Sequence, residues 1–304
     1  MSVPIGPAGW LLLAGWMALA MAAGASFGAE PWRRGLSSVC VALLLVLPFA
    51  APAEEHLARG LVGLGAMMAL MRRVEAARGP RPPLPWALLF LLPVDVPTLR
   101  AAPARLDRED LVRALVHAIV LALGVALVRL SLAAPASSAP LGSLLRWLGG
   151  AMFFYGFLDT AASLARAALA AFGIDVAPMQ RDPILSRSVA EHWGARWNLV
   201  VSTWLRRFVL LPVTRRTRSA IAGSSASFAW SAALHAFFVL AALGPGWALS
   251  MGGYFVLQGL AFLLEQRLGL SRWPSWLARA WTVLVVLGAS PLFVEPGLRL
   301  LSLV

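Results

Sequence analysis

The sequence predicts an all-α, polytopic membrane protein: a transmembrane bundle of about eight spans with additional re-entrant or interfacial helices. Three observations lead to this prediction. Of the 304 residues, 60% are hydrophobic and only 13% are charged, and the mean hydropathy is +0.76. Soluble domains are nearer half apolar and a quarter charged. The apolar residues are also gathered into long runs, and arginines occupy the stretches between them.

Eight apolar runs are candidates for membrane-spanning helices, since ~20 apolar residues cross a hydrocarbon core of ~30 Å. These runs cover residues 8–27, 36–53, 57–71, 111–133, 144–172, 226–243, 247–264 and 277–294. No basic residue precedes the first run, which is untypical of a cleaved signal peptide and favours a span. Residues 84–93 and 199–213 are too short or too charged to cross, and they predict re-entrant or interfacial helices.

All 26 basic residues are arginines, and they outnumber the 14 acidic residues. They are spread between the apolar runs instead of forming one stripe or arm, so nucleic acid is not expected as a partner. The positive-inside rule places residues 72–113, 173–225 and 265–276 in the cytoplasm. The absence of lysine and the compact loops favour a bacterial plasma membrane. Without repeats or an appended soluble part, residues 1–304 are expected to form one membrane domain.

The chain has one cysteine, Cys40, and four scattered histidines, so no disulfide and no metal site are predicted. Ionisable groups at membrane depth are costly, which makes each one a candidate for function. His235, near the middle of residues 226–243, fits two roles: a proton acceptor, or a packing histidine bonded to a carbonyl of the next helix. His117 has no obvious partner in the sequence and is expected to be structural.

Two further pairs of charges lie in or near the apolar runs. Asp159 and Arg166 are seven residues apart and therefore share a helix face. Structural contacts with neighbouring spans are favoured for them over a proton relay. Glu265 and Arg267 stand at a helix end, where we expect both side chains to snorkel toward the membrane surface.

The segment of residues 181–213 combines aromatic and basic side chains. Its tryptophans recur at intervals of four and seven, which predicts that they line one side of a helix: Trp193, Trp197 and Trp204. Four polar side chains stand among them: Arg196, Asn198, Arg206 and Arg207. The pattern is also typical of an interfacial amphipathic helix, with aromatics at headgroup level and arginines toward anionic lipid.

A family resemblance rests on two strings. The first is His192-Trp193-Gly194-Ala195-Arg196-Trp197-Asn198 with Trp204-Leu205-Arg206-Arg207 and Pro212, and the second is Ser224-Ser225-Ala226-Ser227 leading to His235. Together they resemble the signature of the wax-synthase-like branch of the membrane-bound O-acyltransferases (MBOAT). The 37 residues from Asn198 to His235 are similar to the gap between the paired asparagine and histidine of related sterol and diacylglycerol acyltransferases.

Two positions depart from the family pattern. Many members carry a glutamate directly after the histidine, where this chain has Ala236. An aromatic residue often precedes the first tryptophan, where this chain has His192.

The resemblance implies an MBOAT-like fold and transfer of a fatty acyl group from acyl-CoA to the hydroxyl of a lipophilic alcohol. It implies no cofactor, acyl-CoA being a co-substrate, and it assigns the catalytic part to residues 178–270. His235 would be the general base, and Asn198 would orient the reacting groups or stabilise charge on the carbonyl oxygen. Four residues are assigned to substrate binding: Trp193, Arg196, Trp197 and Arg206.

Two alternatives remain open from the sequence. The first is a proton-coupled transporter of small molecules or lipids in which His235 and Asp159 carry protons; the lack of paired halves argues against it. The second is an acyltransferase-like membrane protein that has lost catalysis, for which Ala236 is the only indication.

Overall fold

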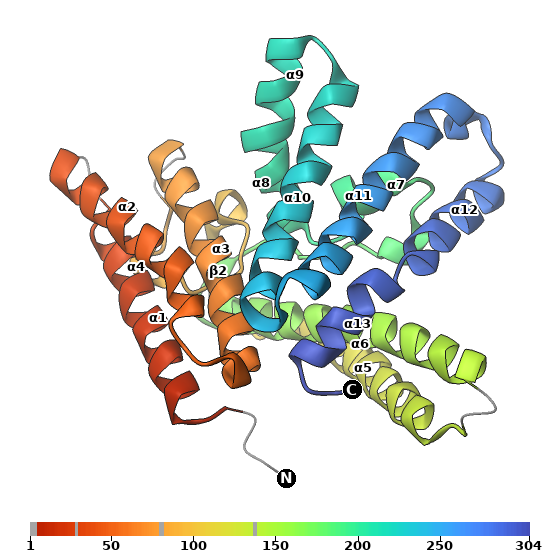
Figure 1. The fold of residues 1–304 in the computed structure, drawn as a ribbon. Helices are drawn as coiled ribbons and strands as arrows, with labels where there is room; N and C mark the ends of the chain where they lie inside the picture. The colour runs from red at the N-terminus through yellow and green to blue at the C-terminus, as the bar shows by residue number, and fades with distance from the viewer. Residues whose placement is uncertain (1–4, 28–29, 79–81, 136–138) are drawn as a thin grey trace. The chain divides into compact units, whose positions relative to one another are not determined.

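The computed structural model describes residues 5–27, 30–78, 82–135 and 139–304, and it is almost entirely helical, which confirms the predicted fold class (Figure 1). The α-helices are α1 (Pro7–Ala25), α2 (Pro31–Val46), α3 (His56–Arg78), α4 (Trp86–Leu89), α5 (Arg108–Ala133), α6 (Ala139–Ala171), α7 (Val189–Glu191), α8 (Leu199–Leu205), α9 (Leu211–Thr217), α10 (Ala220–Leu243), α11 (Pro245–Leu268), α12 (Ser275–Gly288) and α13 (Pro291–Leu300).

Shorter elements connect these helices. The 3₁₀ turns are η1 (Leu47–Phe49), η2 (Ala53–Glu55), η3 (Val96–Thr98), η5 (Pro183–Leu185) and η8 (Leu270–Arg272). The π-helical turns are η6 (His192–Arg196) and η7 (Arg206–Leu210). Two-residue strands β1 (Arg100–Ala101) and β2 (Ile174–Asp175) pair in antiparallel fashion.

The chain divides into two compact units. Unit 1 comprises residues 1–99, 231–252 and 300–302, and unit 2 comprises residues 100–230, 253–299 and 303–304. The division passes through α10 and α11. It assigns the tryptophan-rich motif to unit 2 and His235 to unit 1. Whether residues 1–304 behave as one domain stays a prediction.

In the part of the chain that the structure describes, six helices are long and apolar enough to cross a membrane: α1, Pro31–Phe49, α5, α6, α10 and α11. Helices α12 and α13, bent by 45° at their junction, make a seventh candidate if taken together. The prediction was about eight spans, and the described residues give six or seven candidates. Residues 57–71 do lie in a helix, α3, but Arg59 near its start and Arg72 near its end leave too short an uncharged stretch.

In unit 1, α1, α2 and α3 pack through small and apolar side chains such as Ala20, Leu44 and Ala66. The predicted re-entrant stretch, residues 84–93, contains the single turn α4 and then irregular backbone. Arg72 is 1% exposed; it pairs with Glu75 and donates hydrogen bonds to the carbonyls of Leu89, Leu92 and Val94. Irregular backbone at membrane depth needs such internal donors.

In unit 2, α5 and α6 lie side by side along much of their lengths (Figure 1). Three glycines allow the close approach: Gly124, Gly149 and Gly156. A Cβ at Gly124 would lie 2.5 Å from the backbone nitrogen of Phe153, and one at Gly156 would lie 2.5 Å from that of Leu121. Small residues at a helix contact are the usual device for close packing in lipid.

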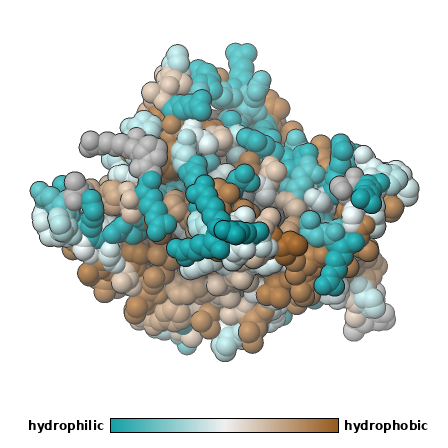
Figure 2. Space-filling model, turned by 90° about the horizontal axis from the view of Figure 1, so that it is seen from above, coloured by the Kyte–Doolittle hydropathy of each residue, from teal (hydrophilic) through white to brown (hydrophobic). Residues whose placement is uncertain are grey.

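Large apolar side chains remain exposed on many of these helices. On α5 they include Val112, Leu115, Val116, Ile119 and Leu123. Figure 2 shows brown, hydrophobic side chains over much of the visible surface, with teal, hydrophilic side chains among them. Exposed apolar surface of this extent is expected of helices solvated by lipid. The chain is an integral membrane protein.

Candidate functional site

The motif segment folds as a series of short turns. Ser188 caps α7 by accepting a hydrogen bond of 2.9 Å from the backbone nitrogen of Glu191. The π-helical turn η6 follows directly, and Trp197 then continues in an extended conformation before α8 begins. The prediction that Trp193, Trp197 and Trp204 line one side of a helix is therefore wrong. The chain leaves the helical path at Trp197, and sequence spacing does not reveal such a break.

Backbone bonds and one arginine close this segment into a loop. The backbone nitrogen of Arg181 donates to the carbonyl of Arg196 (2.8 Å), and that of Leu199 donates to the carbonyl of Met179 (2.7 Å). The Arg196 guanidinium forms an ion pair with Glu191 (2.6 Å) and donates to the carbonyl of Arg181 (3.1 Å). Arg196 thus stabilises the loop from within; its assignment to substrate binding stays a prediction.

Two polar side chains of α11 hold the loop and α12. Glu265, 3% exposed, accepts hydrogen bonds from the backbone nitrogen of Val189 (2.7 Å) and from Nε1 of Trp281 (3.0 Å). Gln258, fully buried, accepts one from Nε1 of Trp193 (3.2 Å). The expected snorkelling of Glu265 is wrong, because its carboxylate finds donors inside the bundle. Neither donor is evident from the sequence near Glu265.

A cavity of about 240 Å³ lies in unit 2, between the motif loop (residues 179–199), α6, α11, α12 and α13. Its lining is mainly aliphatic and aromatic, and it includes Trp193 and Trp197, two of the predicted substrate-binding residues. The hydroxyl of Tyr254 donates to the carbonyl of Val286 (3.4 Å), and the hydroxyl of Thr282 donates within α12. Most of the polar groups in the wall are therefore already satisfied by the protein.

His192 lines this cavity and is 7% exposed. Its ring stacks on Trp197, with the centroids 5.7 Å apart and the planes 15° apart, and meets Trp193 edge-on. Nδ1 lies 3.3 Å from the carbonyl oxygen of Pro183. A carbonyl oxygen only accepts, so Nδ1 carries the hydrogen and Nε2 carries the lone pair. Burial lowers the pKa of His192 to about 4, so the ring is neutral near neutral pH.

The two predicted catalytic residues lie in different units. Asn198, with a left-handed backbone (φ 41°), caps α8, its side-chain oxygen lying 3.4 Å from the backbone nitrogen of Val201. His235 lies in α10, and its Nδ1 is 2.8 Å from the carbonyl oxygen of Ser231 one turn earlier. The carbonyl is therefore on its own helix and not on the next one. The expected meeting of Asn198 and His235 stays a prediction.

Arg206, the fourth predicted substrate-binding residue, begins the π-helical turn η7 and is exposed. Arg207, its neighbour, is exposed as well. Trp204 is buried and its ring lies 5.2 Å from that of Phe208, so it contributes to packing and not to the cavity wall.

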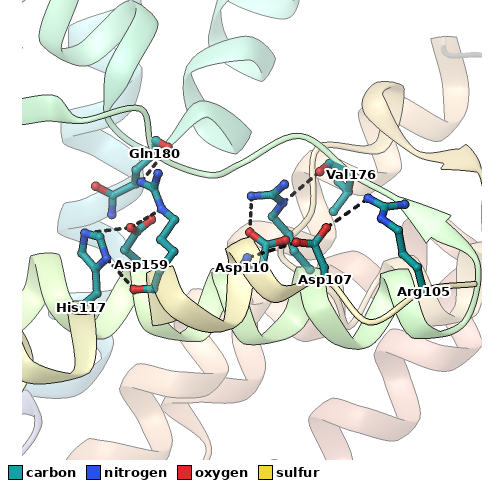
Figure 3. A network of polar contacts seen from close by, with 9 residues as sticks. Arg105, Asp107, Asp110, His117, Asp159, Val176 and Gln180 are labelled. Atoms are coloured by element: carbon teal, nitrogen blue, oxygen red, sulfur yellow. Dashed lines mark hydrogen bonds and ion pairs between the residues drawn. The ribbon is translucent and has the colours of Figure 1, made fainter. Parts of the chain in front are cut away.

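A buried charge network joins α5 to α6 (Figure 3). Asp159, 1% exposed, accepts from Nε of Arg113 (2.7 Å) and lies 3.0 Å from Nε2 of His117. Nδ1 of His117 lies 2.9 Å from the carbonyl oxygen of Arg113, and Nε2 is also 3.1 Å from the hydroxyl of Tyr155. Both ring nitrogens face acceptors. Tyr155 also lines the cavity, so the network supports its wall.

A second ion pair along the same helices is also drawn in Figure 3. Arg166 on α6 binds Asp110 on α5 (2.7 Å) and donates to the carbonyl of Val176 (3.1 Å). The expected contacts of Asp159 and Arg166 with a neighbouring span are present. His117 is structural as expected, but its partners were missed, because the residues that contact it through Nε2 lie 38 and 42 positions away in the sequence.

Comparison with known proteins adds the remaining observation. The chain is 35% identical over 122 residues to a long-chain-alcohol O-fatty-acyltransferase of Simmondsia chinensis, covering 37% of this chain and 34% of that protein. It is 32% identical over 141 residues to a probable long-chain-alcohol O-fatty-acyltransferase 2 of Arabidopsis thaliana, covering 42% and 40%. No family model matches the chain. The resemblance to wax synthases is confirmed.

The matched parts span about a third to two fifths of the length of these wax-synthase relatives. Within the wax-synthase-like signature, the structure brings three residues to one cavity: His192, Trp193 and Trp197. Sequence reasoning left His192 without a role. The signal that could have identified it was its departure from the aromatic residue that often precedes the first tryptophan of the signature.

Proposed function

We propose that the protein is an acyl-CoA-dependent O-acyltransferase that transfers a fatty acyl group to the hydroxyl of a long-chain, lipophilic alcohol. The observation that carries this proposal is its similarity to curated long-chain-alcohol O-fatty-acyltransferases of two plants. The tryptophan-rich motif and the histidine-bearing helix are the parts of the chain on which the chemistry is assigned.

In the proposed reaction the alcohol oxygen attacks the thioester carbonyl carbon of acyl-CoA. An alcohol is a weak nucleophile, so Nε2 of His235 takes the hydroxyl proton as the new C–O bond forms. The C–S bond then breaks, and the CoA sulfur leaves with the proton returned by the imidazolium. The hydrogen bond from Nδ1 of His235 to the carbonyl of Ser231 supports this role, because it leaves the lone pair on Nε2.

We assign to Asn198 the stabilisation of the negative charge that develops on the thioester carbonyl oxygen during the attack. Its side-chain oxygen caps α8, so the two amide hydrogens are the donors that it can direct at a thioester oxygen. Removing one such donor typically slows an acyl transfer by ~10²–10³-fold.

The anionic CoA head requires cations on the side from which it arrives. We assign its phosphates to exposed Arg206, while Arg196, already paired with Glu191, contributes less. Following the positive-inside rule, we assign residues 72–113, 173–225 and 265–276 to the cytoplasmic side. The lack of lysine and the compact loops are the reason for assigning the chain to a bacterial plasma membrane. The acyl chain and the alcohol remain in lipid.

The test is an ester assay. The purified protein in detergent receives radiolabelled palmitoyl-CoA with hexadecanol, a sterol or diacylglycerol. We expect label to enter a wax ester with hexadecanol, and His235→Ala to lose ~10²–10⁴-fold of that rate while keeping its helical content. His56→Ala, a histidine bonded at the chain surface to Glu54 and Ser302, is the control and should keep the rate.

Two results contradict the proposal. One is no ester with any acceptor from a protein whose circular dichroism remains helical. The other is an equal rate from the wild type and His235→Ala, which would remove the histidine from the reaction. Proton-coupled flux in liposomes without ester formation would instead favour a transporter.

A further inference from the structure

Two of the leucines that line the cavity in unit 2 are also exposed at the protein surface. Leu148 of α6 and Leu287 of α12 both line it and are 43% and 40% exposed. Both helices belong to candidate membrane-spanning segments. Exposed leucines at the rim of an apolar cavity in such helices face hydrocarbon, so a ligand can enter from the bilayer without crossing water.

The shape and polarity of the cavity favour a single hydrocarbon chain. Its volume of about 240 Å³ is small, so we expect it to hold part of a chain while the rest extends past the rim. Aromatic rings of Phe154, Tyr155 and Phe293 form much of the wall. No arginine, aspartate or glutamate contributes to the lining among the described residues. An anionic head group such as that of CoA therefore has no counter-charge there.

His192 offers a hydrogen-bond acceptor to a ligand in this cavity. Nδ1 is directed at the carbonyl of Pro183, and the nearby hydroxyl of Ser186 donates to the same carbonyl (2.6 Å). Within the described ranges, no donor contacts Nε2 of His192. A hydrogen bond from a ligand hydroxyl to this nitrogen would contribute about 0.5–1.5 kcal/mol to binding.

We propose that this cavity binds a long-chain alcohol entering from the bilayer, and that Nε2 of His192 accepts the hydrogen bond of its hydroxyl. The chain lies against the aromatic wall and leaves between α6 and α12. His192 is then a specificity-determining residue: it distinguishes an alcohol from an alkane of the same length. A hydrogen-bonding site of this kind discriminates because its polar atom is left unpaired by the wrong ligand.

The inference rests on the proposed function only in naming the alcohol as a substrate. The contact with His192 is made by the bound alcohol before any proton moves. Such ground-state binding lowers KM without raising kcat. His235 therefore keeps its assigned role in the reaction, and His192 governs alcohol affinity.

Binding is measured without turnover. The full chain in lipid nanodiscs is photolabelled with a hexadecanol that carries a diazirine near the middle of its chain, and the labelled residues are mapped by mass spectrometry. We expect label on α6, α12 and the motif loop. Competition uses three unlabelled ligands: hexadecanol, hexadecane, and the thioether S-hexadecyl-CoA, which cannot transfer an acyl group. Hexadecanol should compete about five- to tenfold better than hexadecane.

Three variants sharpen the result. His192→Phe keeps an aromatic ring and should bind hexadecanol about five- to tenfold more weakly and no better than hexadecane. His192→Gln returns an acceptor near the position of Nε2 and should recover part of the preference. His56→Phe applies the same change to a histidine outside the cavity and should leave the preference intact.

Several results would overturn the inference. Equal competition by hexadecanol and hexadecane for the wild type would remove His192 from recognition. Displacement of the label by S-hexadecyl-CoA but not by hexadecanol would make the cavity an acyl-chain site. Label confined to other helices would place the alcohol elsewhere. Because no acyl donor is present, these results are independent of whether the protein forms an ester.

Discussion

His192 and His235 are two imidazoles of the wax-synthase-like motif, and they are held in different ways. Nδ1 of His235 is bonded to the carbonyl four residues earlier on its own helix, an arrangement that helix geometry offers to any residue. Nδ1 of His192 is bonded to a carbonyl nine residues earlier, across a series of turns. His235 can be placed from sequence pattern alone. The position of His192 depends on the folded loop, and so does its place in the cavity wall.

The same contrast appears in His117. Its Nδ1 is bonded to the carbonyl of Arg113, again four residues earlier, yet its ring is buried beside Asp159. The same kind of local hydrogen bond, from Nδ1 to the carbonyl four residues earlier, therefore occurs in a histidine of the charge network and in the proposed catalytic base. What distinguishes these histidines is the set of side chains that tertiary structure brings to Nε2.

The largest expected effect on stability is that of breaking the charge network behind the cavity wall. Asp159→Ala would leave the partly exposed Arg113 and the buried His117 without their carboxylate and should destabilise the protein by about 3 kcal/mol. Thermal unfolding in detergent measures this. Asp175→Ala, which breaks an exposed pair with Arg105, is the matched control and should change little. Equal effects would show that the network does not support unit 2.

A second prediction concerns the reaction rate and distinguishes two roles of Asn198: capping α8 and stabilising charge in the reaction. Asn198→Asp retains an oxygen to cap α8 but removes the amide hydrogens, so stability should be kept while kcat falls by about 10²–10³-fold. Ester formation and thermal unfolding are measured on the same preparation. If kcat is unchanged, the only role of Asn198 is to start the helix.

A third effect depends on pH. The pKa of His192 falls from 6.5 to about 4 on burial, so the unfolded chain binds a proton between those values and the folded chain does not. The contribution of the neutral His192 ring to the free energy of unfolding is therefore fully present above pH 6.5. It is lost as the pH falls from 6.5 toward 4. By pH 5 the wild type should lose about 2 kcal/mol more than His192→Phe. Parallel unfolding curves for the two proteins from pH 7 to pH 5 would contradict burial of the ring.

The smallest effect concerns the anchor of the motif loop. Gln258→Leu leaves Nε1 of Trp193 without its acceptor and should destabilise the protein by about 1 kcal/mol. Gln266→Leu, an exposed position on the same helix, is the control. Loss of hexadecanol binding in Gln258→Leu, with helicity retained, would show that Trp193 must be held in place for the cavity to form.

Much of the fold was predictable because hydropathy reports directly on helices in lipid. Helices α1, α2, α5, α6, α10 and α11 all coincide with apolar runs. Residues 57–71 lie in a helix that is not among the candidate spans, because Arg59 and Arg72 leave too short an uncharged stretch between them. The tryptophan stripe failed because a π-helical turn and an extended residue interrupt the periodicity.

At the candidate site, the tryptophans and the motif were evident from the sequence, but the cavity was not. Its walls come from α6, α11, α12, α13 and the loop, and no local pattern records that these elements meet. Glu265 shows the same limit. From the sequence it resembles a surface charge at a helix end. The structure shows that it accepts hydrogen bonds from Val189 and Trp281 inside the bundle.

The most direct test of the account compares the two histidines in one kinetic experiment. KM for hexadecanol and kcat for ester formation are measured for the wild type, His192→Phe and His235→Ala. We predict that His192→Phe raises KM about five- to tenfold with kcat retained. His235→Ala should lower kcat by about 10²–10⁴-fold. A fall in kcat for His192→Phe together with an unchanged kcat for His235→Ala would contradict the assignment of affinity to one ring and catalysis to the other.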